Sequence, residues 1–567
     1  MDLISHDILV IGGGLAGLRA AVEAKMAGRD VAVLSKVHPL RSHSVAAQGG
    51  INASLGNAPA PIKDTWENHA FDTVKGSDYL ADQDAVEVMC REGTDRVIEM
   101  EHWGTLFSRD ENGKIGQRPF GGAGFPRTCY AADRTGHNLL HTLYEQAMGL
   151  QIPFYEEWYA LSLLRDNERC LGTIAFHLFE GKIISILAKA VILATGGYGR
   201  IYSRSTNAVI NTGSGCYLAY KAGIPLEDVE FVQFHPTSLY GTNILITEAA
   251  RGEGGYLFNA KGERFMERYA PKLLELGPRD IVARGIQTEI DQGLGFDGEY
   301  VHLDLRHLGK EKILDRLPGI RQIAIDFAGV DPIREPIPVQ PGQHYSMGGI
   351  PTTVDGETPL PGLFAAGECA CVSVHGANRL GGNSLLETLV FGARAGKKAV
   401  EKIETGKTVA NEAPFRHQLK VFQSDLDELL ERKSEEPCSR LRDEMRMLMT
   451  SRAGIFRKES DFLSAKEKIR EFKERLKRIG LKQKDFAFNH ELMQYLELEG
   501  MIHLAEVIVE GAMARKESRG SHFRTDYPER DDRNWLRHTL AYRTPEGLRL
   551  DYKDVTITNY PPEKRTY

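Results

Sequence analysis

The chain has 567 residues, of which 42% are hydrophobic and 26% are charged, and its formal net charge at pH 7 is -7. This length is too great for one compact core and predicts roughly three or four domains. The charge balance argues against a nucleic-acid-binding protein, because phosphate recognition needs a basic surface.

Membrane-spanning and targeting segments are not expected. No apolar run in the sequence approaches the roughly 20 residues that a membrane-spanning helix needs. The first expected strand lies close to the N-terminus and leaves no room for a signal or transit peptide. We therefore expect a cytoplasmic protein whose contact with a membrane, if any, runs through a partner.

Residues 7–34 predict a dinucleotide-binding unit, because an apolar strand, a glycine-rich turn, a helix and a second strand follow one another there. In such a unit Gly12 permits the tight turn, Gly14 lets the backbone approach the pyrophosphate, and Gly17 lets helix and strand pack closely. The pyrophosphate then lies at the helix N-terminus, where free N–H groups favour an anion.

The end of the second strand departs from a simple nicotinamide site. An acidic residue normally follows there and binds the adenosine ribose, whereas this chain has Ser35 and Lys36. Two later strands, at 190–194 and 362–366, also run into glycines and fit an FAD site. Glu368 follows the second of them and is expected to bind the ribitol hydroxyls, unless it is only a solvated loop residue.

The C-terminal third of the chain is expected to be helical and then irregular. Apolar residues recur near helical spacing between about 398 and 515. The charge-rich segment 460–484 is expected to be a solvated helical face. The last 50 residues are rich in Arg, Asp and Tyr, and we expect them to wrap the surface without regular structure.

Seven scattered cysteines fit a reducing compartment. No CxxC spacing occurs, so the chain is expected to carry neither an iron–sulfur cluster nor a zinc ion, and no metal ligand is assigned. Cys369 and Cys371 are expected to pack at a buried strand end.

Residues 35–50, SKVHPLRSHSVAAQGG, resemble the flavoprotein subunits of succinate dehydrogenase and fumarate reductase. Further motifs carry the resemblance through almost the whole chain. They are QFHPTS at 233–238, TEAARGEGG at 247–255, GERFMERYAP at 262–271, PRDIVARG at 278–285, HYSMGGIPT at 344–352, HGANRLGGNSLLE at 375–387, SRGSHFRTDYPERDD at 518–532 and the ending RTY. Several long motifs in family order make a chance match negligible.

The resemblance implies FAD joined covalently to His43, within RSHS at 41–44. A covalent substituent raises the flavin's potential, which suits succinate because it is a poor reductant. Ser214 stands where most relatives have Asp and so offers no carboxylate. The cofactor contacts implied are Gly12, Gly13, Gly14, Leu15, Ala16, Gly17, Ser35, Lys36, Ser42, His43, Ser44, Gln48, Gly49, Gly50, Ala194, Thr195, Gly196, Ser214, Glu368, Arg379, Ser384 and Leu385.

A dicarboxylate site is implied by four positions, of which Arg379 is also a cofactor contact. Arg379 and His344 are expected to hold one carboxylate of the substrate, and His235 and Thr247 the other. Arginine suits this role because its planar fork matches a carboxylate with two parallel hydrogen bonds. Taken singly, each residue has a structural alternative: a surface ion pair for the arginine, a core or loop position for a histidine, and a turn cap for the threonine.

Proton transfer is assigned by the same resemblance to Arg279, within Pro278-Arg279-Asp280. Because a guanidinium holds its proton tightly, a proton delivered from it must be replaced quickly. Glu248 and Arg251 match the family's relay for that purpose. The alternative for this pair is a structural ion pair.

The fold class expected is α/β, with a Rossmann-like FAD-binding domain, an inserted α+β capping domain and a C-terminal helical domain. The expected boundaries are 1–232 and 345–397 for the FAD-binding domain, 233–344 for the capping domain, 398–515 for the helical domain and 516–567 for the C-terminal region. The active site is then expected between the FAD-binding and capping domains.

The resemblance also implies partners: an iron–sulfur subunit, and usually a membrane anchor with a quinone site, at the cytoplasmic face of a prokaryotic membrane. The same residues serve succinate oxidation and fumarate reduction. An L-aspartate oxidase shares the fold and the dicarboxylate residues but lacks the histidine link, so RSHS at 41–44 argues against it. A flavin-binding scaffold without activity is the other alternative, and the intact set of arginines and histidines argues against that.

Overall fold

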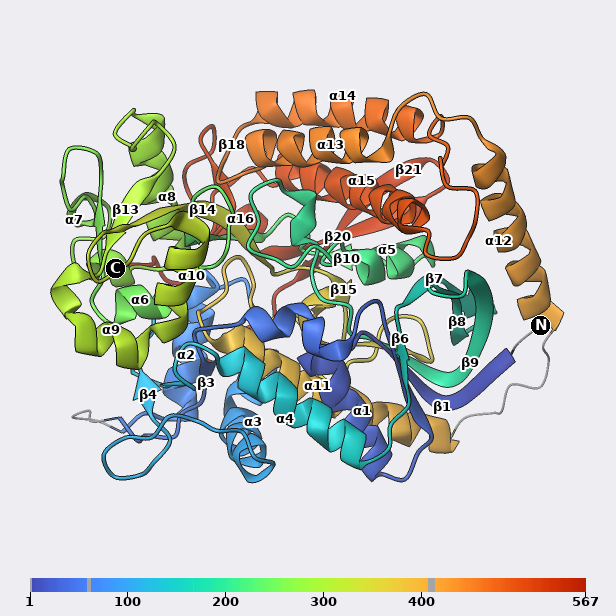
Figure 1. Cartoon of the computed structure of the whole chain (residues 1–567), viewed down its shortest axis with the longest axis horizontal. Helices are drawn as coiled ribbons and strands as arrows, with labels where there is room; N and C mark the ends of the chain where they lie inside the picture. The colour runs from blue at the N-terminus through green and yellow to red at the C-terminus, as the bar shows by residue number, and fades with distance from the viewer. Residues whose placement is uncertain (1–2, 59–62, 167, 406–412, 567) are drawn as a thin grey trace.

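The computed structural model describes residues 3–58, 63–166, 168–405 and 413–566. A seven-stranded mixed sheet forms the centre of the N-terminal half (Figure 1). Its strand order is β6-β2-β1-β9-β8-β7, and β16 also pairs with β9. The strands are β1 Leu3–Ile11, β2 Val31–Ser35, β6 Phe154–Glu156, β7 Trp158–Arg165, β8 Cys170–His177, β9 Lys182–Leu193 and β16 Leu363–Ala365.

Parallel pairing joins β6, β2, β1, β9 and β16 and confirms the Rossmann-like α/β core. Residues 8–10 of β1 are wholly buried, as expected of a parallel strand covered on both faces. β1 starts at Leu3, four residues before the predicted strand. The helix after the glycine turn, α1 Leu15–Met26, ends before Gly28, whose φ of +79° suits a glycine after a helix end.

Helices α1 and α11 pack against each other beside the sheet, with α4 and α3 next to them (Figure 1). Small two- and three-stranded ladders hold the loops around this layer. The elements are α2 Trp66–Gly76, α3 Gln83–His102, α4 Thr135–Gly149, α5 Ser214–Lys221 and α11 Asn383–Thr405, with β3 Ile51–Asn52, β4 Gln117–Arg118, β5 Thr128–Cys129, β15 Ile350–Pro351 and β17 Ala370–Cys371.

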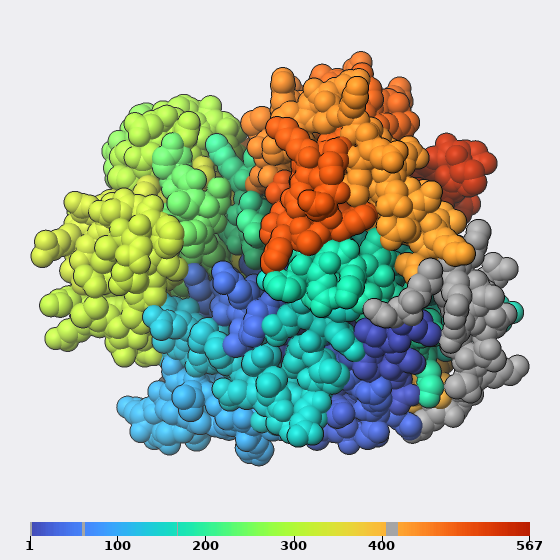
Figure 2. Space-filling view, turned by 45° about the vertical axis from the view of Figure 1, so that its right-hand side comes forward, coloured from blue at the N-terminus to red at the C-terminus, as the bar shows by residue number. Residues whose placement is uncertain are grey.

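An antiparallel sheet of order β11-β14-β13-β12 forms a second lobe, which Figure 2 shows beside the N-terminal and C-terminal parts of the chain. Its own core of Leu, Ile, Val and Phe side chains is separate from the core of the central sheet. The elements are β11 Val232–Leu239, β12 Tyr256–Phe258, β13 Val301–Asp304, β14 Ile337–Ser346, α6 Glu248–Gly252, α7 Met266–Tyr269, α8 Arg279–Asp291, α9 Lys310–Arg316 and α10 Pro318–Ala328.

The C-terminal part contains long helices, as predicted. Helix α14 illustrates the pattern, since Phe462, Ala465, Ile469, Phe472 and Leu476 are buried along one side and charged residues occupy the other. The helices are α12 Ala413–Glu431, α13 Cys438–Arg452, α14 Glu459–Leu476, α15 His490–Ala514 and α16 Asp532–Trp535. None of the helices within the described ranges is both long and apolar enough to cross a membrane.

The expectation that the last 50 residues lack regular structure is wrong. Strands β20 Arg537–Thr544 and β21 Gly547–Asp554 form an antiparallel hairpin, and β20 also pairs with β10 Leu226–Glu227. Polar and apolar residues alternate along β21 but not along β20, so no consistent period-two pattern marks the hairpin in the sequence. A short parallel ladder joins β18 Phe456–Arg457 to β19 Phe523–Arg524.

Candidate active site

A pocket with a cavity of about 200 Å³ lies beside the carboxyl ends of β1, β9 and β16. Ligands of open α/β sheets bind at such strand ends. The pocket continues to the second lobe, where β11, α6 and α8 contribute to its wall. One ligand-binding space is therefore built from residues hundreds of positions apart.

The glycine turn after β1 is sterically required. Gly12 has a φ of +119°, and a Cβ built there would lie 2.1 Å from the Ala194 carbonyl oxygen. A Cβ on Gly17 would lie 1.9 Å from the Gly12 carbonyl oxygen, so α1 can approach β1 only through a glycine. Gly17 does not line the pocket, unlike Gly14, and acts on the site through packing.

All the other predicted cofactor contacts line the same pocket. They are Gly12, Gly13, Gly14, Leu15, Ala16, Ser35, Lys36, Ser42, His43, Ser44, Gln48, Gly49, Gly50, Ala194, Thr195, Gly196, Ser214, Glu368, Arg379, Ser384 and Leu385. Ser214 starts α5 and reaches the pocket although it has no carboxylate. Glu368 accepts a hydrogen bond of 3.0 Å from the Ser346 N–H, and burial raises the pKa of its carboxyl to about 7.

His43 lies at the start of a short 3-10 turn and faces the pocket. Its Nδ1 is 3.2 Å from the backbone nitrogen of Ala208, which donates to it, and its Nε2 is 3.3 Å from Nδ2 of Asn207. Burial, aided by Arg200, lowers the pKa of His43 to about 4. The imidazole is therefore neutral near pH 7 and keeps the lone pair that a bond to carbon requires.

The pocket contains buried polar atoms that have no hydrogen-bond partner among the described residues. They are Ser42 Oγ, Gln48 Oε1, Thr195 Oγ1, Asn211 Nδ2 and Arg379 Nε. Buried polar groups are normally paired, so such a group of atoms points to a ligand. Together with the glycine turn at a helix N-terminus, this donor and acceptor set fits a long dinucleotide such as FAD.

At the other end of the pocket two arginines meet. Arg279 starts α8, and its Nε donates to Oε2 of Glu248 at 2.6 Å. The Oε1 of Gln233 accepts from Arg279 Nη1 at 3.2 Å and from Arg379 Nη2 at 3.1 Å. Arg379 also lies over the Tyr345 ring, 4.5 Å from its centre. Burial and the nearby Arg279 lower the pKa of Arg379 to about 9.

Two histidines complete this cationic end. The ring centres of His235 and His344 lie 4.9 Å apart, and both rings line the pocket. Burial lowers the pKa of both histidines well below the usual range. The nearby Arg279 lowers the pKa of His235 further. At His344 the further lowering of the pKa comes first from His235 and then from Arg279. Both imidazoles are therefore neutral and can donate one hydrogen bond each. Thr247 also lines the pocket, although its Oγ1 caps α6 as well.

The Glu248 carboxylate is fixed from two sides, because the Gly121 N–H donates to its Oε1 at 2.6 Å while Arg279 holds Oε2. Burial would raise the pKa of this carboxyl, but Arg279 and Arg251 outweigh it and keep that pKa below its usual value. Arg251 does not line the pocket. Its Nη1 donates to the Glu275 carbonyl oxygen at 2.5 Å, and its Nε and Nη2 have no partner within the described part of the chain.

Sequence reasoning missed Phe120 and Tyr345, which line the pocket, and Gln233, which does not line it but bridges two of its arginines. Gln233 lies two positions before His235 in β11, so the alternation of a strand could have drawn attention to it. Phe120 comes from a loop and contacts the position of Gly49, and Tyr345 follows His344 directly. No sequence signal distinguishes Phe120 from an ordinary loop aromatic.

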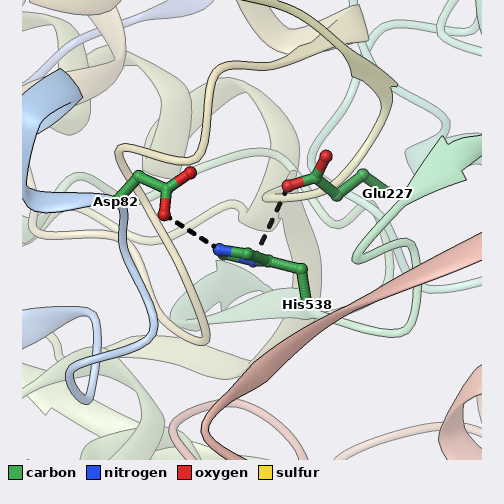
Figure 3. A group of neighbouring side chains, drawn as sticks. All are labelled: Asp82, Glu227 and His538. Atoms are coloured by element: carbon green, nitrogen blue, oxygen red, sulfur yellow. Dashed lines mark hydrogen bonds and ion pairs between the residues drawn. The ribbon is translucent and has the colours of Figure 1, made fainter. Parts of the chain in front are cut away.

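A second cluster of titratable side chains lies under the C-terminal hairpin, where Asp82, Glu227 and His538 point toward one another (Figure 3). Such a trio has the composition of a metal site. However, His538 Nδ1 lies 2.7 Å from the Asp228 carboxylate, and Lys553 Nζ lies 3.1 Å from the Asp82 carboxylate. Burial alone would lower the pKa of His538, but Asp228 and its neighbours raise it to about 10. An imidazolium and an ammonium already supply the positive charge.

Comparison with known families gives two matches. Residues 7–385 match the FAD binding domain, and residues 442–567 match the fumarate reductase flavoprotein C-terminal region. The first region includes all the pocket residues except Thr388.

Curated relatives and solved structures are similar over the whole chain. The succinate dehydrogenase flavoprotein subunit of Rickettsia bellii is 47% identical over 100% of this chain and 99% of its own. The fumarate reductase flavoprotein subunit of Escherichia coli is 43% identical over 100% of this chain and 96% of its own. A solved E. coli quinol fumarate reductase chain superposes with a TM-score of 0.96 at 42% identity, covering 100% of this chain and 99% of that chain.

Proposed function

This chain belongs to the succinate dehydrogenase and fumarate reductase flavoprotein subunits, FAD-dependent oxidoreductases that interconvert succinate and fumarate, and from this membership we propose how its own residues bind the substrate and move a proton. The observation that carries the proposal is the cationic end of the pocket. Two buried arginines and two neutral histidines converge there next to residues that fit FAD. A small dianion is the ligand that such a surface favours.

We propose that Arg379 and His344 hold one carboxylate of the substrate, and that His235 and Thr247 donate to the other. The support is geometric and electrostatic. Arg379 presents a guanidinium held by Tyr345 and Gln233, and each histidine is a neutral donor. Because these groups are buried and fixed before substrate arrives, their attraction to a carboxylate is little screened by water.

FAD, when bound, supplies the hydride chemistry at one carbon of the substrate. Arg279 is the group proposed to deliver a proton to the adjacent carbon of the substrate, or to take it from there. Glu248 is its source or sink, since the Nε of Arg279 and Oε2 of Glu248 are 2.6 Å apart. Arg251 supports that carboxylate electrostatically from outside the pocket.

The flavin is covalently attached in this family, and we propose His43 as the residue that carries it. Its neutral imidazole lines the pocket, which supports this choice. We further propose that the second lobe is the capping domain over 233–344, between 1–232 and 345–397 of the FAD-binding domain, with helices over 398–515 and a C-terminal region beyond.

We propose the partners on the same basis. Electrons leave through a separate iron–sulfur subunit and a membrane anchor, which would place this chain at the cytoplasmic face of the membrane. In support, two of the most similar structures are of quinol–fumarate reductase. The sequence of this chain has no CxxC spacing of its own for a cluster.

The covalent link is tested by acid precipitation of the purified holoprotein. We expect the yellow pigment to remain in the pellet of the wild type and to enter the supernatant in His43→Ser, while both proteins bind FAD before acid is added. His137→Ser, which changes an exposed histidine, serves as the control and should retain the pigment. Release of all the pigment from the wild type would contradict the assignment of His43.

A further inference from the structure

The segment near residue 565 contacts the helix that carries Arg279, although the two are far apart in sequence. Nη2 of Arg565 lies 2.8 Å from Oδ2 of Asp280, the residue after Arg279. The Asp280 side chain is fully buried, and that of Arg565 is only 10% exposed. Arg565 belongs to the ending RTY, one of the motifs that carry the family resemblance, but it has no part in the reaction described above.

Asp280 starts a chain of hydrogen bonds that ends at both substrate-site arginines. Its Oδ1 accepts from Nδ2 of Asn378 at 3.2 Å, and Oδ1 of Asn378 accepts from Nε2 of Gln233 at 2.9 Å. Gln233 Oε1 then accepts from Arg279 and Arg379 at 3.2 and 3.1 Å. Asn378 and Gln233 are both buried, so water does not compete for these bonds.

Asp280 is one of several acceptors that orient the two amides of this hydrogen-bond chain, since Asn378 Nδ2 also donates to the Gly76 carbonyl oxygen at 3.2 Å and Gln233 Nε2 to the Arg379 carbonyl oxygen at 2.8 Å. A carboxylate only accepts hydrogen bonds, so Asn378 must turn its NH₂ toward Asp280 and its oxygen toward Gln233. Gln233 must then turn its NH₂ toward Asn378 and its oxygen toward the arginines. A reversed Gln233 amide would place donors against two guanidiniums, which have only donors themselves.

We propose that Arg565 is a positioning residue for the substrate site, acting through Asp280, Asn378 and Gln233 on Arg279 and Arg379. Arg284 also contacts Asp280, at 3.2 Å and from the same helix. Without Arg565, the carboxylate is free to turn toward Arg284 and away from Asn378. Asn378 then loses its carboxylate acceptor, so the amides that hold the two arginines together are fixed less firmly.

The inference rests on the proposed roles of Arg279 and Arg379, and a kinetic comparison tests it. In Arg565→Gln we expect kcat/KM for succinate to fall roughly 10- to 100-fold, mainly through KM, because a displaced binding group weakens substrate alignment. Arg565→Lys should recover part of the loss. Flavin content should match the wild type, and the exposed Arg533→Gln is the control expected to leave the kinetics unchanged.

A double-variant comparison separates positioning from a general structural role. If Arg565 acts through Gln233, then adding Arg565→Gln to Gln233→Leu should cause no further loss, whereas independent effects would multiply. Multiplying effects, or normal kinetics in Arg565→Gln, would overturn the proposal. If the Arg565 variants cannot be purified, Asn378→Ser interrupts the chain at its middle, and normal KM in that variant would overturn it equally.

The parallel Arg379→Gln measurement keeps this inference distinct from the proposed function. An unchanged KM for succinate in Arg379→Gln would refute the assignment of the substrate site itself. A raised KM there, with normal kinetics in Arg565→Gln, would leave that assignment standing and refute only the positioning role.

Discussion

The two buried clusters of charged side chains in this molecule differ in how completely their charges are paired. In the pocket, Arg279 is paired with Glu248, while Arg379 has no ion-pair partner among the residues that the structure describes. Under the C-terminal hairpin, by contrast, His538 and Lys553 are surrounded by carboxylates at ion-pair distance.

This difference separates binding from stability. Burying an unpaired cation costs free energy, which an anionic ligand can offset. The pocket therefore holds its positive charge ready for a dicarboxylate, whereas the cluster at Asp82 and His538 neutralises itself and ties the hairpin to the rest of the chain. Changes in the first cluster should alter turnover, and changes in the second should alter stability.

The largest effect is expected in the pocket. Arg279→Ala should lower kcat by about 10²–10⁴-fold, because it removes the positioned group for proton transfer. Flavin content should stay close to that of the wild type. Steady-state rates with succinate and with fumarate provide the measurement, and near-normal rates would remove Arg279 from the mechanism.

The next effect tests the paired cluster. His538→Gln removes the cation between Asp82 and Asp228, and breaking a buried ion pair in this way typically costs about 3–5 kcal/mol in the free energy of unfolding. Denaturant unfolding of the FAD-loaded protein measures it, with the exposed His102→Gln as the matched control. KM for succinate should not change in this variant. A large rise in KM without a loss of stability would contradict the assignment of the second cluster to stability and not to substrate binding.

The smallest effect is a pH dependence. The pKa of His538 is raised to about 10, so its contribution to stability is complete below about pH 6.5 and is lost as pH rises through about 10. The pKa of the Glu227 carboxyl is raised to about 7, so its titration also lowers the free energy of unfolding as pH rises, but at lower pH than that of His538. Between pH 7 and 10 the free energy of unfolding should fall more steeply in the wild type than in His538→Gln, by at most about 1.4 kcal/mol per pH unit. Parallel slopes would contradict this.

Much of the site could be predicted because its residues lie in continuous motifs. The glycine turn, the strand ends and the motifs around His43, His235 and Arg379 all contribute to one pocket, as expected. Gln233 was missed because its role comes from bridging two arginines that are distant in sequence. The pairing of Asp82 with His538 joins positions 456 residues apart, and no local sequence pattern predicts such a contact.

The hairpin shows the same limit in the fold. Its strands were not predicted because Arg, Asp and Lys interrupt their apolar residues, whereas pairing with β10 and burial of the His538 side chain stabilise them in three dimensions. Local propensity is a weak guide where tertiary contacts decide the outcome. The N-terminal unit was easier to predict because its turn, helix and strands are specified within some 30 residues.

The contact between Arg565 and Asp280 also sets an order of events during synthesis. Arg565 is added 285 residues after Asp280, which corresponds to roughly 15–60 s at about 5–20 residues per second. The glycine turn and most of the pocket are made before Asp280, and the last pocket residue, Thr388, follows early in that interval, so the pocket can fold before its distant anchor exists. A nascent or prematurely terminated polypeptide could therefore bind flavin and turn yellow while Arg279 and Arg379 still lack the alignment needed to bind the substrate.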